Sequence, residues 1–441
     1  MRIRKLLRVR FVVDPFTEQE KIMAELTPMM QKYMETKEQY KDCILFYRLG
    51  DFYEMFFDDA LVASKELEIT LTGKSCGLEE RAPMCGIPYH AVEGYLSKLV
   101  SRGYKVAICE QVEDPKLAKG LVKREVIRVV TPGTNLNVQS LEAGKNNYLL
   151  SIAYTPDGIG ISAADVTTGD YYVTEVEDLK KLNDELMKYE PSEIICNEAF
   201  LVSGFDVNDL KSRLHISVNA LESHMFDDDG CRRILMKHFK VNTLIGLGVE
   251  EFPTGLLAAG ALLQYLYDTQ KTDLEHFTHI YPYLTSKYML LDSSTRRNLE
   301  LTETLREKQK RGSLLWVLDK TKTAMGARLL RNYIEQPLIE KDEMEKRLDA
   351  IQELNQDSIS RDEIREYLNP IYDLERLLSK VTYKTANPRD LIAFRNSLQM
   401  LPPIKTVLSA FEKEELTKIR EQIDGLEDIY QLIDEAIIDE P

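Results

Sequence analysis

One short segment, Gly50-Asp-Phe-Tyr-Glu-Met-Phe-Phe57, combines several aromatic rings with a glutamate. An aromatic side chain that is exposed at the tip of a turn can enter a DNA base step as a wedge. Phe52 is the residue placed for that role. Glu54, two residues further on, would then hydrogen-bond the same base. This chemistry requires that Phe52 stays in solvent.

The same residues have a structural interpretation. The apolar run 43–49 predicts a strand that Gly50 ends, and a helix would then run from Phe52 to about residue 67. Asp51 would cap this helix, and Glu54 would complete a capping box. A buried helical stripe would follow, made of Phe52, Phe56, Ala60, Ala63 and Leu67. The local pattern alone favours this interpretation, which buries the wedge.

The tripeptide Gly73-Lys-Ser75 resembles the end of a phosphate-binding loop. The full pattern G-x-x-x-x-G-K-[ST] requires a glycine at position 68, where this chain has Glu68. An acid would repel the phosphate, and no other Gly-Lys-Ser or Gly-Lys-Thr occurs. The sequence therefore predicts no P-loop and no bound cofactor, and leaves enzymatic activity uncertain.

Two acids, Asp165 and Asp170, lie at the ends of predicted strands. Paired carboxylates at such positions hold two Mg²⁺ ions in nucleases. Alternatively, Asp165 ends its strand and Asp170 belongs to the turn Thr-Thr-Gly-Asp. The six histidines are scattered and include no pair at i, i+4 spacing, so we expect no metal site.

Length and composition limit the class of protein. The chain has 441 residues, of which 44% are hydrophobic and 29% charged, which predicts about three globular domains. No run of about 18 uncharged apolar residues occurs, so a membrane span is excluded. Six cysteines without a C-x-x-C pair indicate reduced thiols in a cytoplasmic protein.

The net charge of −16 opposes nucleic-acid binding over most of the chain. Two segments differ from this average. Residues 1–17 carry five basic residues and one acid, a net of +4, and residues 95–131 carry eight and four, also +4. A DNA contact would therefore be local. The basic residues 1–22 are either a DNA-binding arm or an extension from an upstream start, with the natural start at Met23.

The pattern of elements changes twice along the chain. Residues 23–131 alternate strands and helices, with strands predicted at 43–49, 105–110 and 125–131 and helices at 28–37 and 95–102. A second region opens with three strands in quick succession, a helix and a returning strand, which is the start of an RNase H-like domain. These elements are predicted at 148–154, 159–166, 171–176, 179–189 and 193–196, before a helix at 255–267.

The region after residue 283 is predicted to be almost entirely helical. A long helix is expected at 294–310, a short one capped by Ser313, and another at 324–334. Three or four more follow. The fold class is therefore multidomain, α/β followed by all-α.

Many segments of this chain, in series, resemble the bacterial MutS family of DNA mismatch repair proteins. Among them are Thr27-Pro-Met-Met-Gln-Lys-Tyr33, Leu45-Phe-Tyr-Arg-Leu-Gly-Asp-Phe-Tyr-Glu54, Met84-Cys-Gly-Ile-Pro-Tyr-His-Ala-Val-Glu93 and Thr385-Ala-Asn-Pro-Arg-Asp390. The resemblance runs from about residue 23 to about 441. It implies a mismatch-recognition domain at 23–131, an RNase H-like connector at 132–282, and a helical core and lever region at 283–441. The last would be truncated before the family's clamp and ATPase domains.

The resemblance also implies a function, namely recognition of mispaired or unpaired bases in double-stranded DNA. Phe52 matches the family's wedge and Glu54 its base contact. Lys98, Arg102 and Lys105 are candidates for phosphate contacts. The implied partners are DNA with a mismatch or small loop, a second copy of the chain, and a MutL-type factor, with ATP and Mg²⁺ bound by the full-length family. The alternatives are an RNase H-like nuclease and a structural or interaction fragment.

Overall fold

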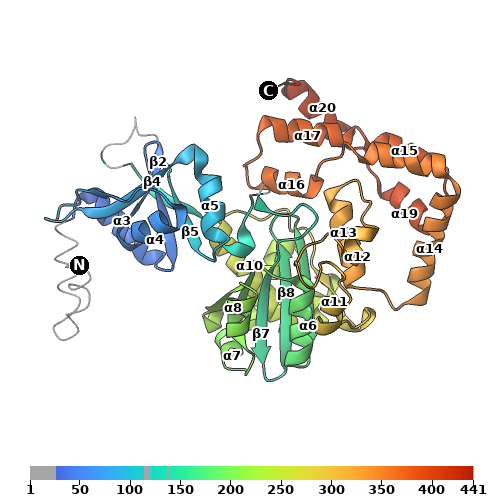
Figure 1. Ribbon diagram of the computed structural model, residues 1–441, viewed down its shortest axis with the longest axis horizontal. Coiled ribbons are helices and arrows are strands. Elements are labelled where there is room, and N and C mark those ends of the chain that lie inside the picture. Colours follow the sequence, from blue (N-terminus) through green and yellow to red (C-terminus); the bar gives the residue numbers. More distant parts are fainter. Residues whose placement is uncertain (1–25, 114–119, 121, 138–139, 441) are drawn as a thin grey trace. The chain divides into compact units, whose positions relative to one another are not determined.

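A computed structural model describes residues 26–113, 120, 122–137 and 140–440 (Figure 1). The chain divides into two compact units. The first ends at residue 132 and includes the short segment 269–271, and the second contains the remainder. The predicted extension 1–22 lies outside the described residues. None of the described helices is long and apolar enough to cross a membrane.

The first unit is built on a six-stranded sheet in the order β3-β4-β2-β1-β5-β6. Its strands are β1 (Cys43–Leu49), β2 (Phe52–Phe56), β3 (Thr72–Lys74), β4 (Ala82–Pro88), β5 (Lys105–Gln111) and β6 (Arg124–Val130). Only β1 and β5 pair in parallel, and the other neighbours are antiparallel. The helices are α3 (Pro28–Gln39), α4 (Phe57–Leu67) and α5 (Val92–Val100).

Alternation along β2 sends its side chains to two separate cores. Phe56 packs with Tyr33 of α3 on one face of the sheet. Tyr53 and Met55 pack on the other face, in a cluster that α4 and α5 also supply. Phe52 and Glu54 belong to the α3 face by the same alternation, but they lie beyond the residues that are fully buried there.

The predicted helix from Phe52 is wrong, because residues 52–56 form strand β2 and the helix begins at Phe57. Leu49 pairs with Phe52 in an antiparallel hairpin, and Phe52 also pairs with Pro88 on β4. No side chain caps α4, so the predicted capping box is also wrong. Pairing on both sides gives the β2 backbone its hydrogen bonds, which outweighs a local helical preference.

The second unit contains another six-stranded sheet, in the order β11-β10-β7-β8-β9-β12. Its strands are β7 (Leu149–Thr155), β8 (Gly158–Asp165), β9 (Asp170–Val176), β10 (Glu193–Asn197), β11 (Ser217–Leu221) and β12 (Tyr281–Pro282). β7, β8 and β9 form an antiparallel meander, and β10 returns parallel to β7. This confirms the predicted succession of three strands, a helix and a returning strand.

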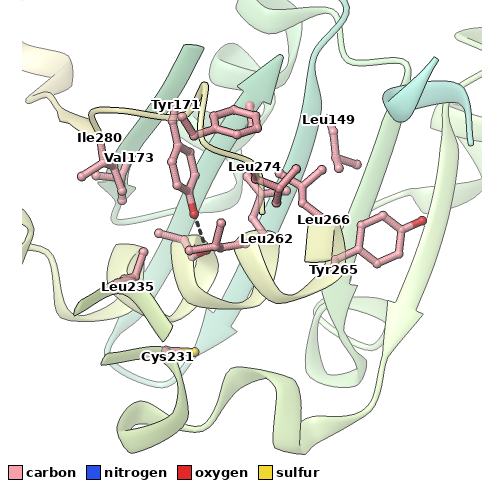
Figure 2. Close-up of a cluster of buried hydrophobic side chains, with 14 of the residues drawn as sticks. Leu149, Tyr171, Val173, Cys231, Leu235, Leu262, Tyr265, Leu266, Leu274 and Ile280 are labelled. Carbon is pink, nitrogen blue, oxygen red and sulfur yellow. Dashed lines mark hydrogen bonds between the residues drawn. The ribbon is translucent and has the colours of Figure 1, made fainter. Parts of the chain in front are cut away.

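Helices pack on both faces of this second sheet. They are α6 (Leu179–Tyr189), α7 (Glu198–Leu201), α8 (Val207–Arg213), α9 (Asp228–Phe239) and α10 (Pro253–Gln270). One core contains residues of α6, α7 and α8, and the other contains residues of α9 and α10. Figure 2 shows the core that contains residues of α9 and α10. In this core, Tyr171 points from β9 toward α10 and donates a hydrogen bond to the carbonyl of Ala259.

The rest of the second unit is helical (Figure 1). Its helices are α11 (Ser293–Asn298), α12 (Leu314–Leu318), α13 (Ala324–Glu335), α14 (Lys341–Gln356), α15 (Ser358–Leu368), α16 (Leu374–Thr382), α17 (Pro388–Leu398), α18 (Leu401–Leu408), α19 (Glu414–Gln422) and α20 (Glu427–Ala436). The predicted cap on α12 is confirmed, since Ser313 Oγ accepts a hydrogen bond from the Trp316 amide. Seven described helices follow α13, where three or four were predicted.

The predicted long helix 294–310 is wrong, because α11 ends at Asn298. The chain turns at Glu300, whose φ of 48° lies in the left-handed region. The carbonyls of Glu300 and Leu301 then accept hydrogen bonds from the amides of Leu314 and Leu315. These long-range bonds replace the i to i+4 bonds that would have continued the helix.

Candidate nucleic-acid interface

The turn between β1 and β2 exposes Phe52. Gly50 and Asp51 connect the two strands, and the positive φ of Gly50 (59°) suits a residue without a Cβ. The Asp51 carbonyl accepts a hydrogen bond of 3.0 Å from the Tyr89 amide, which ties the turn to the residues after β4. Phe52 is 47% exposed, although it lies in a paired strand. An aromatic ring is therefore held in solvent by a well-anchored hairpin.

Glu54 lies on the same face of β2, two residues from Phe52. Its Oε2 accepts a hydrogen bond of 2.6 Å from Lys74 Nζ on β3, which is also an ion pair. Gly86 on β4 pairs with Glu54. A Cβ added at Gly86 would lie 3.6 Å from Glu54 Cγ and 3.9 Å from Phe52 Cδ1. A side chain at position 86 would therefore be in van der Waals contact with both residues, and glycine leaves that volume unfilled.

Arg48 packs beside this turn. Its guanidinium carbon lies 3.8 Å from the centre of the Tyr89 ring, which is a cation–π contact. Its Nη1 lies 3.3 Å from Glu110 Oε1. Arg124 Nε donates a hydrogen bond of 2.7 Å to the Arg48 carbonyl. Both cations are therefore held in defined positions beside the turn, with the Arg48 side chain on the Tyr53 face of the sheet, opposite to Phe52.

A buried acid, Asp59, supports the sheet beneath the site. Its carboxylate accepts hydrogen bonds from the Leu45 amide and Lys37 Nζ, both at 2.9 Å, and from the Tyr33 hydroxyl at 3.3 Å. Burial raises the pKa of this carboxyl. Tyr33 also packs edge-on against Phe56. These contacts connect α3 and α4 with β1, which is the first strand of the hairpin.

The three basic residues predicted to contact phosphates are not gathered around Phe52. Lys98 is exposed on α5, which packs on the opposite face of the sheet. Arg102 forms an ion pair with Glu66 at 2.6 Å. Lys105 pairs with Asp42 at 2.9 Å and lies opposite Cys43, at the end of β1 far from the turn. Their role as phosphate contacts stays a prediction.

Sequence reasoning missed Lys74 and Gly86. The sequence pattern places Lys74 in an incomplete phosphate loop, whereas the structure places it in strand β3. Three neighbouring strands, β3, β4 and β2, bring Lys74, Gly86 and Glu54 together. The residues are up to 32 positions apart, so only a strand-pairing prediction would have found them.

The acids Asp165 and Asp170 face each other across β8 and β9. Asp165 is fully buried, and it accepts hydrogen bonds from the Thr167 amide and hydroxyl and from the Asn147 amide, at 2.7 to 2.9 Å. Asn146 Nδ2 bridges the two carboxylates at 2.9 Å from each. Burial, followed by the Asp165 charge, raises the pKa of Asp170 to about 6. This arrangement supports the turn interpretation, because the carboxylates organise the loop between the strands.

The two sheets, each with its helices, and the helical region that follows define a multidomain protein, α/β in its first parts and helical in its last. Three family descriptions match in chain order: MutS domain I at residues 27–139, MutS domain II at 147–278 and MutS domain III at 294–441. The chain belongs to the MutS family and carries the region of domains I to III.

Curated relatives agree with this assignment. The DNA mismatch repair protein MutS of Lachnoclostridium phytofermentans is 67% identical over 419 residues, which is 95% of this chain and 45% of the relative. The proteins of the same name from Ruminiclostridium cellulolyticum and Clostridioides difficile are 53% and 48% identical, over 95% of this chain and 48% and 44% of theirs. The chain thus spans about half the length of the curated relatives it matches.

Proposed function

We propose that this chain recognises mispaired or unpaired bases in duplex DNA, with Phe52 as the wedge and Glu54 as the base contact. The observation that carries the proposal is the exposure of Phe52, at 47%, on a hairpin whose backbone is paired on both sides. A residue of the predicted buried stripe would be covered. Phe56, Ala60 and Ala63 are fully buried. Phe52 therefore differs in exposure from the other residues of the predicted stripe.

The energetics of a wedge favour discrimination. Separating a base step costs a few kcal/mol, and stacking a base on an aromatic ring returns roughly 1–3 kcal/mol. These terms nearly cancel, so net binding depends on how easily the site deforms. A mismatched pair unstacks more easily than a matched pair. One ring therefore distinguishes the two without reading a particular sequence.

The charges near the wedge fit a contact that is confined to a small area. The chain carries a net charge of −16, which would repel a phosphate backbone over most of its surface. Among the described residues, Lys74 pairs with Glu54, and Arg48 and Arg124 lie beside the turn. Glu54 would discourage phosphates from approaching wherever its charge is not compensated. Lys98, Arg102 and Lys105 remain candidates for contacts to a flanking backbone.

The relatives are named DNA mismatch repair proteins, and we extend that function to this chain. We also propose that it acts with a second copy of itself and a MutL-type factor in the bacterial cytoplasm. Coupling to ATP and Mg²⁺ would reside in domains outside these residues.

Two labelled duplexes that differ in a single base pair test the proposal. One carries a G·T mispair and the other the matched pair, and both are titrated with the purified protein at one fixed salt concentration. We expect tighter binding to the mispaired duplex. A 2-aminopurine placed at the mispair should also change its emission when the protein binds, because its stacking changes. Equal affinities for the two duplexes would contradict the proposal.

A further inference from the structure

We propose that Lys74 is the positioning residue for Glu54. It holds one carboxylate oxygen, directs the other toward the base, and offsets the charge of the acid. This inference rests on the proposed function and deepens it, because it concerns how the base contact is kept ready for DNA.

The geometry defines which oxygen is held. Lys74 Nζ donates to Glu54 Oε2 at 2.6 Å, and such charge-assisted hydrogen bonds are shorter and stronger than neutral ones. Within the described residues, Oε1 of Glu54 has no hydrogen-bond partner. The carboxylate therefore presents one free acceptor in a fixed direction.

The surroundings keep both partners in place. The Glu54 side chain is only 17% exposed and that of Lys74 35%. Lys74 Nζ also lies 5.5 Å from the centre of the Phe56 ring, which is fully buried. Gly86 fills no volume beside Glu54. Lys74 is thus in contact with a buried aromatic ring, and no side chain at position 86 presses on Glu54 or Phe52.

The pair also adjusts the electrostatics of the site. An isolated carboxylate would repel every phosphate backbone, including that of mismatched DNA. Paired with Lys74, the acid forms a nearly neutral unit that DNA can approach. If Lys74 were lost, Glu54 would lose both its orientation and its compensating charge. Binding to the mismatch should then suffer more than binding to the matched duplex, because only the mismatch uses Oε1.

Lys74→Met tests this idea, because it removes the charge and keeps the apolar stem. We expect the ratio of mismatched to matched affinity to fall roughly fivefold, the upper value for a partly exposed ion pair. Lys74→Arg should retain most of the ratio. Lys65→Met is the matched control, since Lys65 is exposed on α4, which packs on the opposite face of the sheet. Thermal unfolding confirms that each variant is folded.

Combining the change with Glu54→Ala separates positioning from a direct phosphate contact. If Lys74 acts through Glu54, Lys74→Met should not lower the affinity ratio further in the Glu54→Ala background. If Lys74→Met weakens both duplexes equally, with or without Glu54, Lys74 contacts phosphate and the inference is overturned. An unchanged ratio would also overturn it.

Phe52→Ala, measured in parallel, distinguishes this inference from the proposed function. If Phe52→Ala abolishes the preference and Lys74→Met does not, only the role of Lys74 is refuted. If the unsubstituted protein shows no preference for the mismatch, the proposed function and the inference fail together.

Discussion

Replacing Phe52 by alanine should remove most of the preference for mismatched DNA and leave the fold intact. The side chain is 47% exposed, so the loss in folding free energy should stay below about 2 kcal/mol, roughly half the cost of emptying a buried phenylalanine site. Stacking on a base is worth roughly 1–3 kcal/mol, which corresponds to an affinity decrease of about 5- to 150-fold. This decrease applies to the mismatched duplex, because the matched duplex resists the wedge.

The assay is a titration of the mispaired and matched duplexes at one salt concentration, since salt alone changes such affinities strongly. Leu61→Ala is the control, because Leu61 is 42% exposed on α4 of the same unit. Phe52→Trp keeps an aromatic face and should retain a preference. If Phe52→Ala keeps the original affinity ratio, or if Leu61→Ala lowers it equally, the assignment of the wedge is refuted.

Three further changes test Glu54 and two buried charged groups of the second unit. Glu54→Ala should tighten binding to the matched duplex. Because Lys74 is then unpaired, the slope of log affinity against log salt should also become steeper by up to about 0.9. An unchanged affinity for the matched duplex would contradict this expectation. Burial raises the pKa of Asp170 to about 6, above the ordinary value of about 3.9, so the folded protein binds this proton more tightly than the unfolded chain. The free energy of unfolding should therefore fall by up to about 3 kcal/mol as the pH rises from about 4 to about 6. Asp170→Asn should remove that part of the pH dependence in urea titrations. The same pH dependence in the variant and the unsubstituted protein would refute the raised pKa of Asp170. The Arg328 side chain is 4% exposed and donates to Asp373 at 2.7 Å and to Glu375 at 2.6 Å. Arg328→Met should therefore destabilise the second unit by roughly 3–5 kcal/mol, whereas Lys418→Met, which breaks an exposed pair, should leave thermal unfolding unchanged. Equal effects of the two changes would contradict the role of burial.

Two segments adopt a backbone structure that differs from the one their local sequence predicts. Residues 52–56 have aromatic residues at helical spacing to later apolar positions, and a plausible cap precedes them. They form a strand because β1 and β4 are available on both sides. Residues 299–310 belong to the predicted long helix, but the carbonyls of Glu300 and Leu301 accept hydrogen bonds from the start of α12 instead. In both cases backbone partners distant in sequence replaced the local hydrogen bonds.

The sequence by itself determined the order of the domains, the strand succession of the second sheet, and Phe52 and Glu54 as the residues to test. Such features depend on periodicity, turn residues and family motifs, all of which are patterns within short segments of the sequence. Tertiary structure alone decided that Phe52 is exposed, that Lys74 holds Glu54, and that Gly86 leaves space beside them. The physical reason is that exposure and side-chain pairing across a sheet depend on strand order and register, which bring together residues that no sequence pattern connects.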